Sequence, residues 1–437
     1  MYLTSVSNLK LSKTQFEIID TMSFTAKSLY NAALYQINKY FKETGEYLDF
    51  GKLDLLMKNL VDDVGKIVYR NLPAQVSQQT LKKLDKNYNS FFKLLKKKQN
   101  GDYDRNINSP KYLPKDGRKE LIFQKQSFRV TDSAIELSIS KELKDKFNLK
   151  FLSVPLPQYL KGKMIKYIEI IPGLNSQYSL HIVYEVQEEV CSNNDVKNWC
   201  SIDLGLNNLA TVTSNVHKPY LINGRPIKSI NQKFNKKIAK LKSKIKKGTS
   251  KQIQQLYTKR GNKLNNEIHK ITDFIIKAVK ESDIDTVVIG YNKGWKQGIN
   301  IGKRINQNFT QIPFHKVIQQ LQYKLQLLGI ELILQEESYT SKTSSFDNEP
   351  VHKHQTYQGR RVKRGLFRTN KGILVNADVN GSLNIFRKAI KNLQKEVHDA
   401  LLEPVDIGFV MNPVRIELKT SLSSTHVFLQ IESIKIS

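Results

Sequence analysis

Helix-like and strand-like patterns alternate through the second half of this 437-residue chain, and this alternation limits its possible folds more than any other feature. Residues 271–279 have helical apolar spacing and lead into the apolar run 286–289. A second helical pattern at 314–328 leads into a strand-like run at 330–334. Because strands joined through helices pair in parallel, the pattern predicts an α/β sheet.

Two aspartates lie at the ends of expected elements, far apart in the sequence. Asp203 stands in an apolar run just before Gly205, and Asp378 stands just before an amphipathic helical pattern. In open α/β sheets, sites form at the carboxyl ends of the strands. Mg²⁺ prefers oxygen ligands, usually one or two carboxylates with water and phosphate. The two segments therefore predict a hard-cation site, in which two ions would clamp a phosphodiester.

The charge balance favours a polyanionic partner. The chain has 70 Lys and Arg residues against 40 Asp and Glu residues, a formal net charge of +30. Nucleic acid fits this excess, and a merely solvated basic surface is the alternative. No apolar run approaches the ~20 residues of a membrane span, and the N-terminus has no signal-like pattern. Only Cys191 and Cys200 are present, so we expect a reducing, cytoplasmic compartment.

The first half of the chain is predicted to hold a helical part followed by a small β-rich part. Helical spacing covers 15–41 and 74–98, with Pro73 just before the second helix. The polar face of that helix is either solvated or in contact with nucleic acid. Alternating apolar and polar residues predict strands between 121 and 190, and the acidic segment 185–197 predicts a linker.

Further along the chain, residues 231–268 are basic and helical, which predicts a helical hairpin. This hairpin either lies on a polyanion or forms a solvated coiled pair. Residues after about 400 include the strand-like run 414–418, and they lie outside the motifs described above.

Several short motifs occur in a fixed order along most of the chain. They are Tyr30-Asn31-Ala32-Ala33, Leu72-Pro73-Ala74-Gln75-Val76, Phe91-Phe92-Lys93, Ile202-Asp203-Leu204-Gly205, His269-Lys270-Ile271, Tyr323-Lys324, Tyr339-Thr340-Ser341 and the block from Asn376 to Ile385. In these motifs the chain resembles the TnpB (OrfB-type) proteins of insertion sequences, which are compact relatives of type V CRISPR effectors.

The resemblance implies an α+β multidomain protein with an RNase H-like (RuvC) α/β nuclease domain. The implied parts are a wedge β-barrel domain at 1–12 and 115–190, an inserted helical recognition domain at 13–114, the nuclease domain at 197–400 and a C-terminal tail at 401–437. Within the nuclease domain, the resemblance implies a basic helical insertion at 231–270 and a degenerate zinc-ribbon or lid region at 340–374.

The resemblance also implies an activity and its partners. The expected activity is Mg²⁺-dependent, RNA-guided cleavage of double-stranded DNA beside a short motif. The guide RNA would come from the transposon end, with one protein copy per RNA. By position, the residues matching family contacts to that motif are Phe50, Gln78, Gln124 and Lys125. Glutamine suits adenine, because it can form two hydrogen bonds with N6 and N7.

The sequence departs from the family pattern at two places. The family usually has a catalytic glutamate where this chain has Gly290, at the end of the run 286–289. It also usually has a zinc ribbon of paired Cys-x-x-Cys motifs, whereas this chain has no cysteine after Cys200. His352 and His354 are too few to replace four thiolates, so no zinc is expected.

The missing glutamate has two interpretations. In the first, Glu336 or Glu337 reaches across the space left by Gly290 from the neighbouring strand. Successive strand residues face opposite sides, and Glu337 is preferred because it directly precedes the shared Ser-Tyr-Thr-Ser run. Two Mg²⁺ ions would then be held by Asp203, Glu337 and Asp378. If both glutamates are solvated strand-end acids, they play no catalytic part.

In the second interpretation the nuclease is inactive, and the protein is an RNA-guided DNA-binding repressor. The retention of Asp203 and Asp378 argues against that loss. A DNA-strand transferase is a third, less favoured hypothesis. Residues 360–368 mix basic and aromatic side chains, which suits either a lid over a substrate strand or a plain basic loop.

Overall fold

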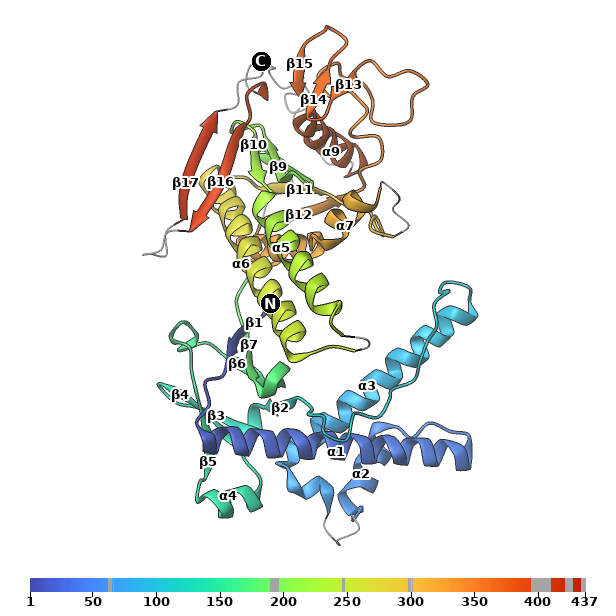
Figure 1. Cartoon of the computed structure of the whole chain (residues 1–437), viewed down its shortest axis with the longest axis vertical. Coiled ribbons are helices and arrows are strands. Elements are labelled where there is room, and N and C mark those ends of the chain that lie inside the picture. Colours follow the sequence, from blue (N-terminus) through green and yellow to red (C-terminus); the bar gives the residue numbers. More distant parts are fainter. Residues whose placement is uncertain are drawn as a thin grey trace. The chain divides into compact units, whose positions relative to one another are not determined.

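The computed structural model describes residues 1–61, 65, 67–188, 196–245, 248–297, 300, 302–393, 410–420 and 427–433. The chain divides into two compact units, Met1–Gln187 and Glu188–Ser437 (Figure 1). The predicted linker at 185–197 falls at this division, and most of it lies outside the described residues. Among the described helices, none combines the length and the apolar character that crossing a membrane requires.

The strands of the first unit form a larger and a smaller antiparallel sheet. The larger has the order β1-β7-β6-β2 and the smaller has the order β3-β4-β5. Their bounds are β1 Tyr2–Asn8, β2 Leu121–Gln124, β3 Phe128–Val130, β4 Ala134–Ser138, β5 Phe151–Pro155, β6 Ile165–Pro172 and β7 Tyr178–Glu185. The strands predicted between 121 and 190 are confirmed, and the N-terminal residues add β1 to the same sheet.

The helices of the first unit connect these strands. They are α1 Lys13–Thr44, α2 Phe50–Asn59, α3 Ala74–Gln99 and α4 Lys141–Phe147, with 3-10 turns η1 Val68–Asn71, η2 Lys125–Ser127, η3 Gln158–Leu160 and η4 Leu174–Ser176. α1 begins at a capping box between Ser12 and Gln15 and ends at Gly45, whose φ of 74° closes the helix. The helices predicted at 15–41 and 74–98 are therefore confirmed, each a little longer than expected.

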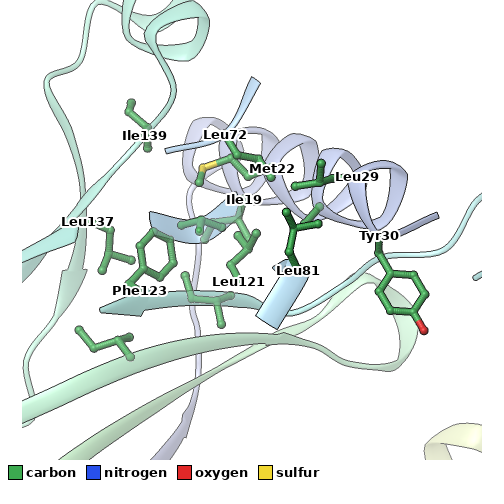
Figure 2. Close-up of a cluster of buried hydrophobic side chains, with 14 of the residues drawn as sticks. Ile19, Met22, Leu29, Tyr30, Leu72, Leu81, Leu121, Phe123, Leu137 and Ile139 are labelled. Carbon is green, nitrogen blue, oxygen red and sulfur yellow. The ribbon is translucent and has the colours of Figure 1, made fainter. Parts of the chain in front are cut away.

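The core of the first unit lies where α1 and α3 pack on the larger sheet. Figure 2 shows buried side chains from all three elements side by side, among them Ile19, Met22 and Leu29 of α1, Leu81 of α3, and Leu121 and Phe123 of β2. Full burial of one such side chain contributes about 1.5–3 kcal/mol. The helices and the sheet are therefore parts of one core in this unit.

The second unit is built on a seven-stranded sheet with the order β12-β11-β8-β9-β10-β16-β17. The strands are β8 Trp199–Leu204, β9 Asn208–Ser214, β10 Tyr220–Asn223, β11 Thr286–Gly290, β12 Glu331–Gln335, β16 Val414–Thr420 and β17 Val427–Ser433. β8, β11 and β12 are mutually parallel, as the alternating pattern predicts. The strand predicted at 414–418 is also confirmed, and it lies beside β10 in this sheet.

Helices cover the two faces of this sheet. They are α5 Arg225–Lys242, α6 Lys251–Glu281, α7 Lys303–Gln311, α8 Phe314–Gln326 and α9 Ala377–Leu393. α6 and α8 pack on one face in a cluster with Ile202 and Ile289, whereas α9 packs on the other face, where Phe386 stacks on Trp199. α5 and α6 pack together as the predicted hairpin (Figure 1).

A polar contact in the first unit gives a direct test of this fold. Arg118 donates to both carboxylate oxygens of Asp20 on α1, over 2.8 and 2.7 Å, and the Tyr178 hydroxyl on β7 donates to the same carboxylate over 2.8 Å. The Arg118 guanidinium holds the pKa of Asp20 below its usual value. The carboxylate therefore ties helix α1 to the larger sheet.

We expect Asp20→Ala to lower the free energy of unfolding by about 2 kcal/mol, because it leaves the partly buried Arg118 without its partner. Denaturant unfolding would measure this change. Glu43→Ala is the matched control, because its pair with Lys39 is exposed and such pairs contribute less than about 1 kcal/mol. Equal losses in both variants would contradict the structural role given to Asp20.

Candidate active site

Asp203 lies on β8, the strand of the parallel group that also pairs with the antiparallel strand β9. It stands opposite Thr211 of β9 in the sheet register. Its side chain faces α9, because the neighbouring Ile202 belongs to the apolar cluster on the opposite face. A Cβ on Gly381 of α9 would lie only 3.1 Å from Oδ2 of Asp203. The glycine therefore allows the helix backbone to approach this carboxylate closely.

Asp378 stands in the first turn of α9. Oδ1 of Asn376 accepts hydrogen bonds from the backbone N–H groups of Asp378 and Val379, over 3.0 and 3.2 Å, and so caps the helix start. Nδ2 of Asn208, on β9, donates to Oδ2 of Asp378 over 2.8 Å. Arg361 forms an ion pair of 3.5 Å with Oδ1. The two aspartates thus approach the same region from a strand and a helix.

Glu337 follows β12 by two residues and lies over Gly290. The strands β11 and β12 pair so that Gly290 stands opposite Gln335. A Cβ on Gly290 would overlap Oε1 of Glu337 and lie 2.8 Å from its Cγ and 2.6 Å from Cδ1 of Ile385. The side chain of Glu337 therefore occupies the space that any side chain at position 290 would need.

Asn292 holds Glu337 in this position from both ends. Its Oδ1 accepts from the backbone N–H of Glu337 over 3.0 Å, and its Nδ2 donates to Oε2 over 3.3 Å. Oε1 of Glu337 is buried and has no hydrogen-bond partner among the described residues. A buried carboxylate oxygen without a partner is costly, so this atom is suited to a cation.

The side chain of Glu336 lies at the surface, away from Glu337's buried site. Lys388 of α9 donates to its Oε2 over 2.5 Å, and the backbone N–H of Ser338 donates to its Oε1 over 2.8 Å. Its side chain is 53% exposed. Burial acts to raise the pKa of Glu336, but its bonds with Lys388 and Ser338 together lower that pKa below its usual value. The adjacent glutamates therefore have opposite environments, and only Glu337 reaches the buried region.

Burial and two neighbouring carboxyl groups disfavour the ionised form of Asp203. Burial raises the pKa of Asp203 well above its usual value, and the charges of Glu337 and Asp378 raise it further. Arg361 acts in the opposite direction on the same group. Burial, with a smaller effect of Glu336, raises the pKa of Glu337 to about 7. A cation that neutralises this negative charge would favour the ionised forms.

The three carboxylates offer the type of ligand atom that hard cations such as Mg²⁺ prefer. Asp203, Glu337 and Asp378 offer only oxygen atoms, and the buried Oε1 of Glu337 lacks a partner. In the described parts of the chain, no three or more His, Cys, Asp or Glu side chains are arranged so that they could hold a metal ion by themselves. Mg²⁺ is usually held by one or two carboxylates, with water and phosphate as its other ligands. 

Polar side chains of α9 fix the loop that follows Glu337. Oδ1 of Asn380 accepts from the backbone N–H and hydroxyl of Ser345, both over 2.9 Å. Nδ2 of Asn384 donates to the carbonyls of Thr340 and Thr343 over 3.0 and 2.7 Å. Both asparagines are buried. These bonds connect the loop directly to the helix that begins at Asp378.

A buried carboxylate organises the region 340–374, where the family usually has a zinc ribbon. Glu349 is 2% exposed, and it accepts from the backbone N–H groups of Ser344 and Gln358 over 2.8 and 2.9 Å. The chain then forms a small antiparallel sheet of β13 Arg360–Lys363, β14 Leu366–Arg368 and β15 Leu374–Asn376. β13 brings Arg361 to Asp378, and β15 leads into α9.

A pocket of about 650 Å³ opens beside Asp378. Its polar lining includes Asn208, Arg225, Arg361, Arg364, Asn376, Asp378 and Arg415. Phe309 adds an aromatic surface to the same pocket. Arginines beside a carboxylate suit a phosphate-rich ligand that approaches a bound cation.

The expected motif-contact residues lie around one end of α3 in the first unit. Gln78 is on α3, whereas Gln124 ends β2 and Lys125 begins η2. Gln75 of α3 donates to Gln126 of η2 over 2.9 Å, which places these segments side by side. Phe50 begins α2, and Nζ of Lys82 lies 5.2 Å from its ring centroid. α3 therefore connects the positions, although their role stays a prediction.

The sequence interpretation missed Asn208, Asn292 and Arg415. Asn292 had a usable signal, because it follows the carboxyl end of β11 two residues after Gly290. Asn208 begins β9, just after the turn from Asp203. Arg415 could not be identified, since its place depends on pairing with β10, nearly 200 positions earlier in the chain.

Comparisons with known proteins find two family models and a solved structure that are similar to this chain. A family model described as a probable transposase of the OrfB_IS605 type matches residues 181–296, which include Asp203 and Gly290. A Cas12f1-like TNB domain model matches residues 314–385, which include Glu337 and Asp378. A Cas12f1–sgRNA–target DNA complex solved by cryo-electron microscopy shares the fold, with a TM-score of 0.54, 17% identity, and coverage of 86% of this chain and 83% of that chain.

Two curated relatives are similar in sequence. The TnpB-like protein ORF457 of Acidianus two-tailed virus is 25% identical over 76% of this chain and 76% of its own length. The CRISPR-associated endodeoxyribonuclease Cas12f2 of a Micrarchaeota archaeon is 25% identical over 50% of this chain and 42% of its own length. The two family models match in the expected order, and together with these relatives they support a TnpB-type family for the chain.

Proposed function

We propose that this protein is an RNA-guided DNA endonuclease of an insertion sequence, with Asp203, Glu337 and Asp378 as its catalytic carboxylates. The observation that carries the proposal is the position of Glu337, whose side chain fills the space over Gly290. A glutamate that follows β12 would thereby replace the one that the family usually has at the end of β11. The site thus keeps three carboxylates despite the glycine.

Each carboxylate has a distinct support for this role. Asp203 lies on the buried strand β8, Asp378 is oriented by Asn208, and Glu337 is oriented by Asn292. Together they would hold two Mg²⁺ ions, which when bound supply an activated water and stabilise the leaving oxygen. Arg361 and Arg364 would orient the phosphate backbone in the adjoining pocket.

The partners of the proposed reaction are a guide RNA from the transposon end and a double-stranded DNA target. The relatives support this pairing, since one is a CRISPR-associated endodeoxyribonuclease and one solved structure with this fold contains sgRNA and target DNA. The net charge of +30 suits two polyanions. Base pairing would provide sequence specificity, while the protein reads a short flanking motif.

The role of Glu337 can be separated from that of its neighbour. We expect Glu337→Ala to reduce cleavage of motif-flanked DNA by about 100-fold or more, the scale found for groups that stabilise a transition state directly. Glu336→Ala is the matched control and should cleave within about 3-fold of the parent, because Glu336 is bound to Lys388. Single-turnover cleavage by the guide-loaded protein with Mg²⁺ would measure both.

Binding measurements complete this test. Both variants should bind guide RNA and target DNA as the parent does, since one carboxylate contributes little to an extensive phosphate interface. Full cleavage by Glu337→Ala would overturn the assignment of Glu337. Guide-dependent binding by the parent without cleavage under any divalent cation would instead support an RNA-guided repressor.

The motif contact generates a separate prediction. We expect Gln78→Ala to relax the preference for the flanking motif, because a glutamine that reads adenine contributes about 1–3 kcal/mol of discrimination. A depletion assay with randomised flanking sequences would measure the preference. Gln99→Ala, at the far end of α3, is the control and should keep the motif preference. An unchanged motif profile in Gln78→Ala would remove this residue from the interface.

A further inference from the structure

Strand β16 places an arginine in the same row of the sheet as Asp203. Asp203 stands opposite Thr211, Thr211 opposite Leu221, and Leu221 opposite Arg415. Residues paired across a sheet point to the same face. Arg415 and Asp203 therefore share one face, three strand spacings or roughly 14 Å apart.

The face of β16 that carries Arg415 is the polar one. Val414, Ile416 and Leu418 pack into the apolar cluster on the opposite side of the sheet. On the α9 side, Glu417 accepts a hydrogen bond from Nδ2 of Asn223 over 2.7 Å. Among the residues whose side chains the structure describes, none forms an ion pair with Arg415. In the strand register Arg415 stands opposite Glu432 of β17.

Arg415 also lines the pocket that contains Asp378. The same pocket has Arg225, Arg361 and Arg364 on its walls, so its cationic groups come from α5, β13, the turn after β13, and β16. A groove with several arginines near a cation-binding carboxylate site fits a chain of phosphates better than a single anion. The arginines are spread over elements from three distant parts of the sequence.

We propose that Arg415 contacts a backbone phosphate of the DNA strand being cleaved, a few nucleotides from the scissile bond. This inference rests on the proposed nuclease function, and it assigns a role to strand β16. The β16 strand extends the sheet beyond β10 and thereby lengthens the cationic track that leads from the carboxylates. Arg415 is a binding and positioning residue and takes no part in the chemical step.

The test measures binding of single-stranded oligo(dT) to the guide-loaded protein in EDTA at several salt concentrations. We expect Arg415→Ala to weaken binding and to reduce the slope of log K against log salt by about 0.7, the value for one lost phosphate contact on a single strand. Arg415→Lys should retain most of the slope because it keeps the charge. Lys277→Ala removes an exposed charge outside the pocket and should leave both quantities unchanged.

Each further outcome has a defined meaning. Unchanged oligo(dT) affinity and slope in Arg415→Ala would overturn the proposal. Weaker guide RNA binding with unchanged oligo(dT) binding would overturn it in favour of an RNA contact. If Arg415→Lys loses as much as Arg415→Ala, the effect is on folding of the strand, and the phosphate contact is wrong. Because EDTA prevents cleavage, the binding result is independent of whether the parent cleaves DNA.

Discussion

The parallel pairing of β11 with β12 is the constraint on which the candidate site depends. This pairing sets Gly290 opposite Gln335, so the chain leaving β12 passes directly over the glycine. Glu337 can then extend into a buried region that already contains Asp203 on the next strand. Asn292 reinforces the arrangement with hydrogen bonds to the backbone and the carboxylate of Glu337. The position of the Glu337 carboxylate depends on the glycine, because a side chain at 290 would occupy the same space.

The region after Glu337 is held by hydrogen bonds within the chain. Asn380 and Asn384 connect it to α9, and the buried carboxylate of Glu349 joins residues 344 and 358. A carboxylate that accepts several N–H bonds can organise loops much as a metal ion does, although each bond contributes only about 1–3 kcal/mol. The same region delivers Arg361 to Asp378, so its internal order bears directly on the geometry of the candidate site.

Local patterns predicted the helices and the parallel strands, because apolar spacing reports which face of an element is buried. The sequence also predicted Asp203 and Asp378 as site residues. It preferred Glu337 to Glu336 because only one of the two should face inward and Glu337 directly precedes the run shared with the family. It did not reveal Asn292 as the support of Glu337, nor Arg415 as part of the pocket. Arg415 reaches the site only through the register of β10 with β16, and such long-range pairing leaves no periodic signal in the sequence. The division of the chain into wedge, recognition and nuclease domains stays a prediction.

The most direct test of the central claim is the DNA cleavage rate of Gly290→Ala. A methyl group at 290 would overlap the Glu337 carboxylate and crowd Cδ1 of Ile385, so we expect cleavage to fall at least about 10-fold, while retained guide RNA binding would show that the variant is folded. Gly261→Ala is the matched control, because a Cβ there meets nothing within 4 Å on helix α6, and it should cleave normally. Cleavage by Gly290→Ala at the rate of the parent would contradict the account, because Glu337 would then not need the space over the glycine.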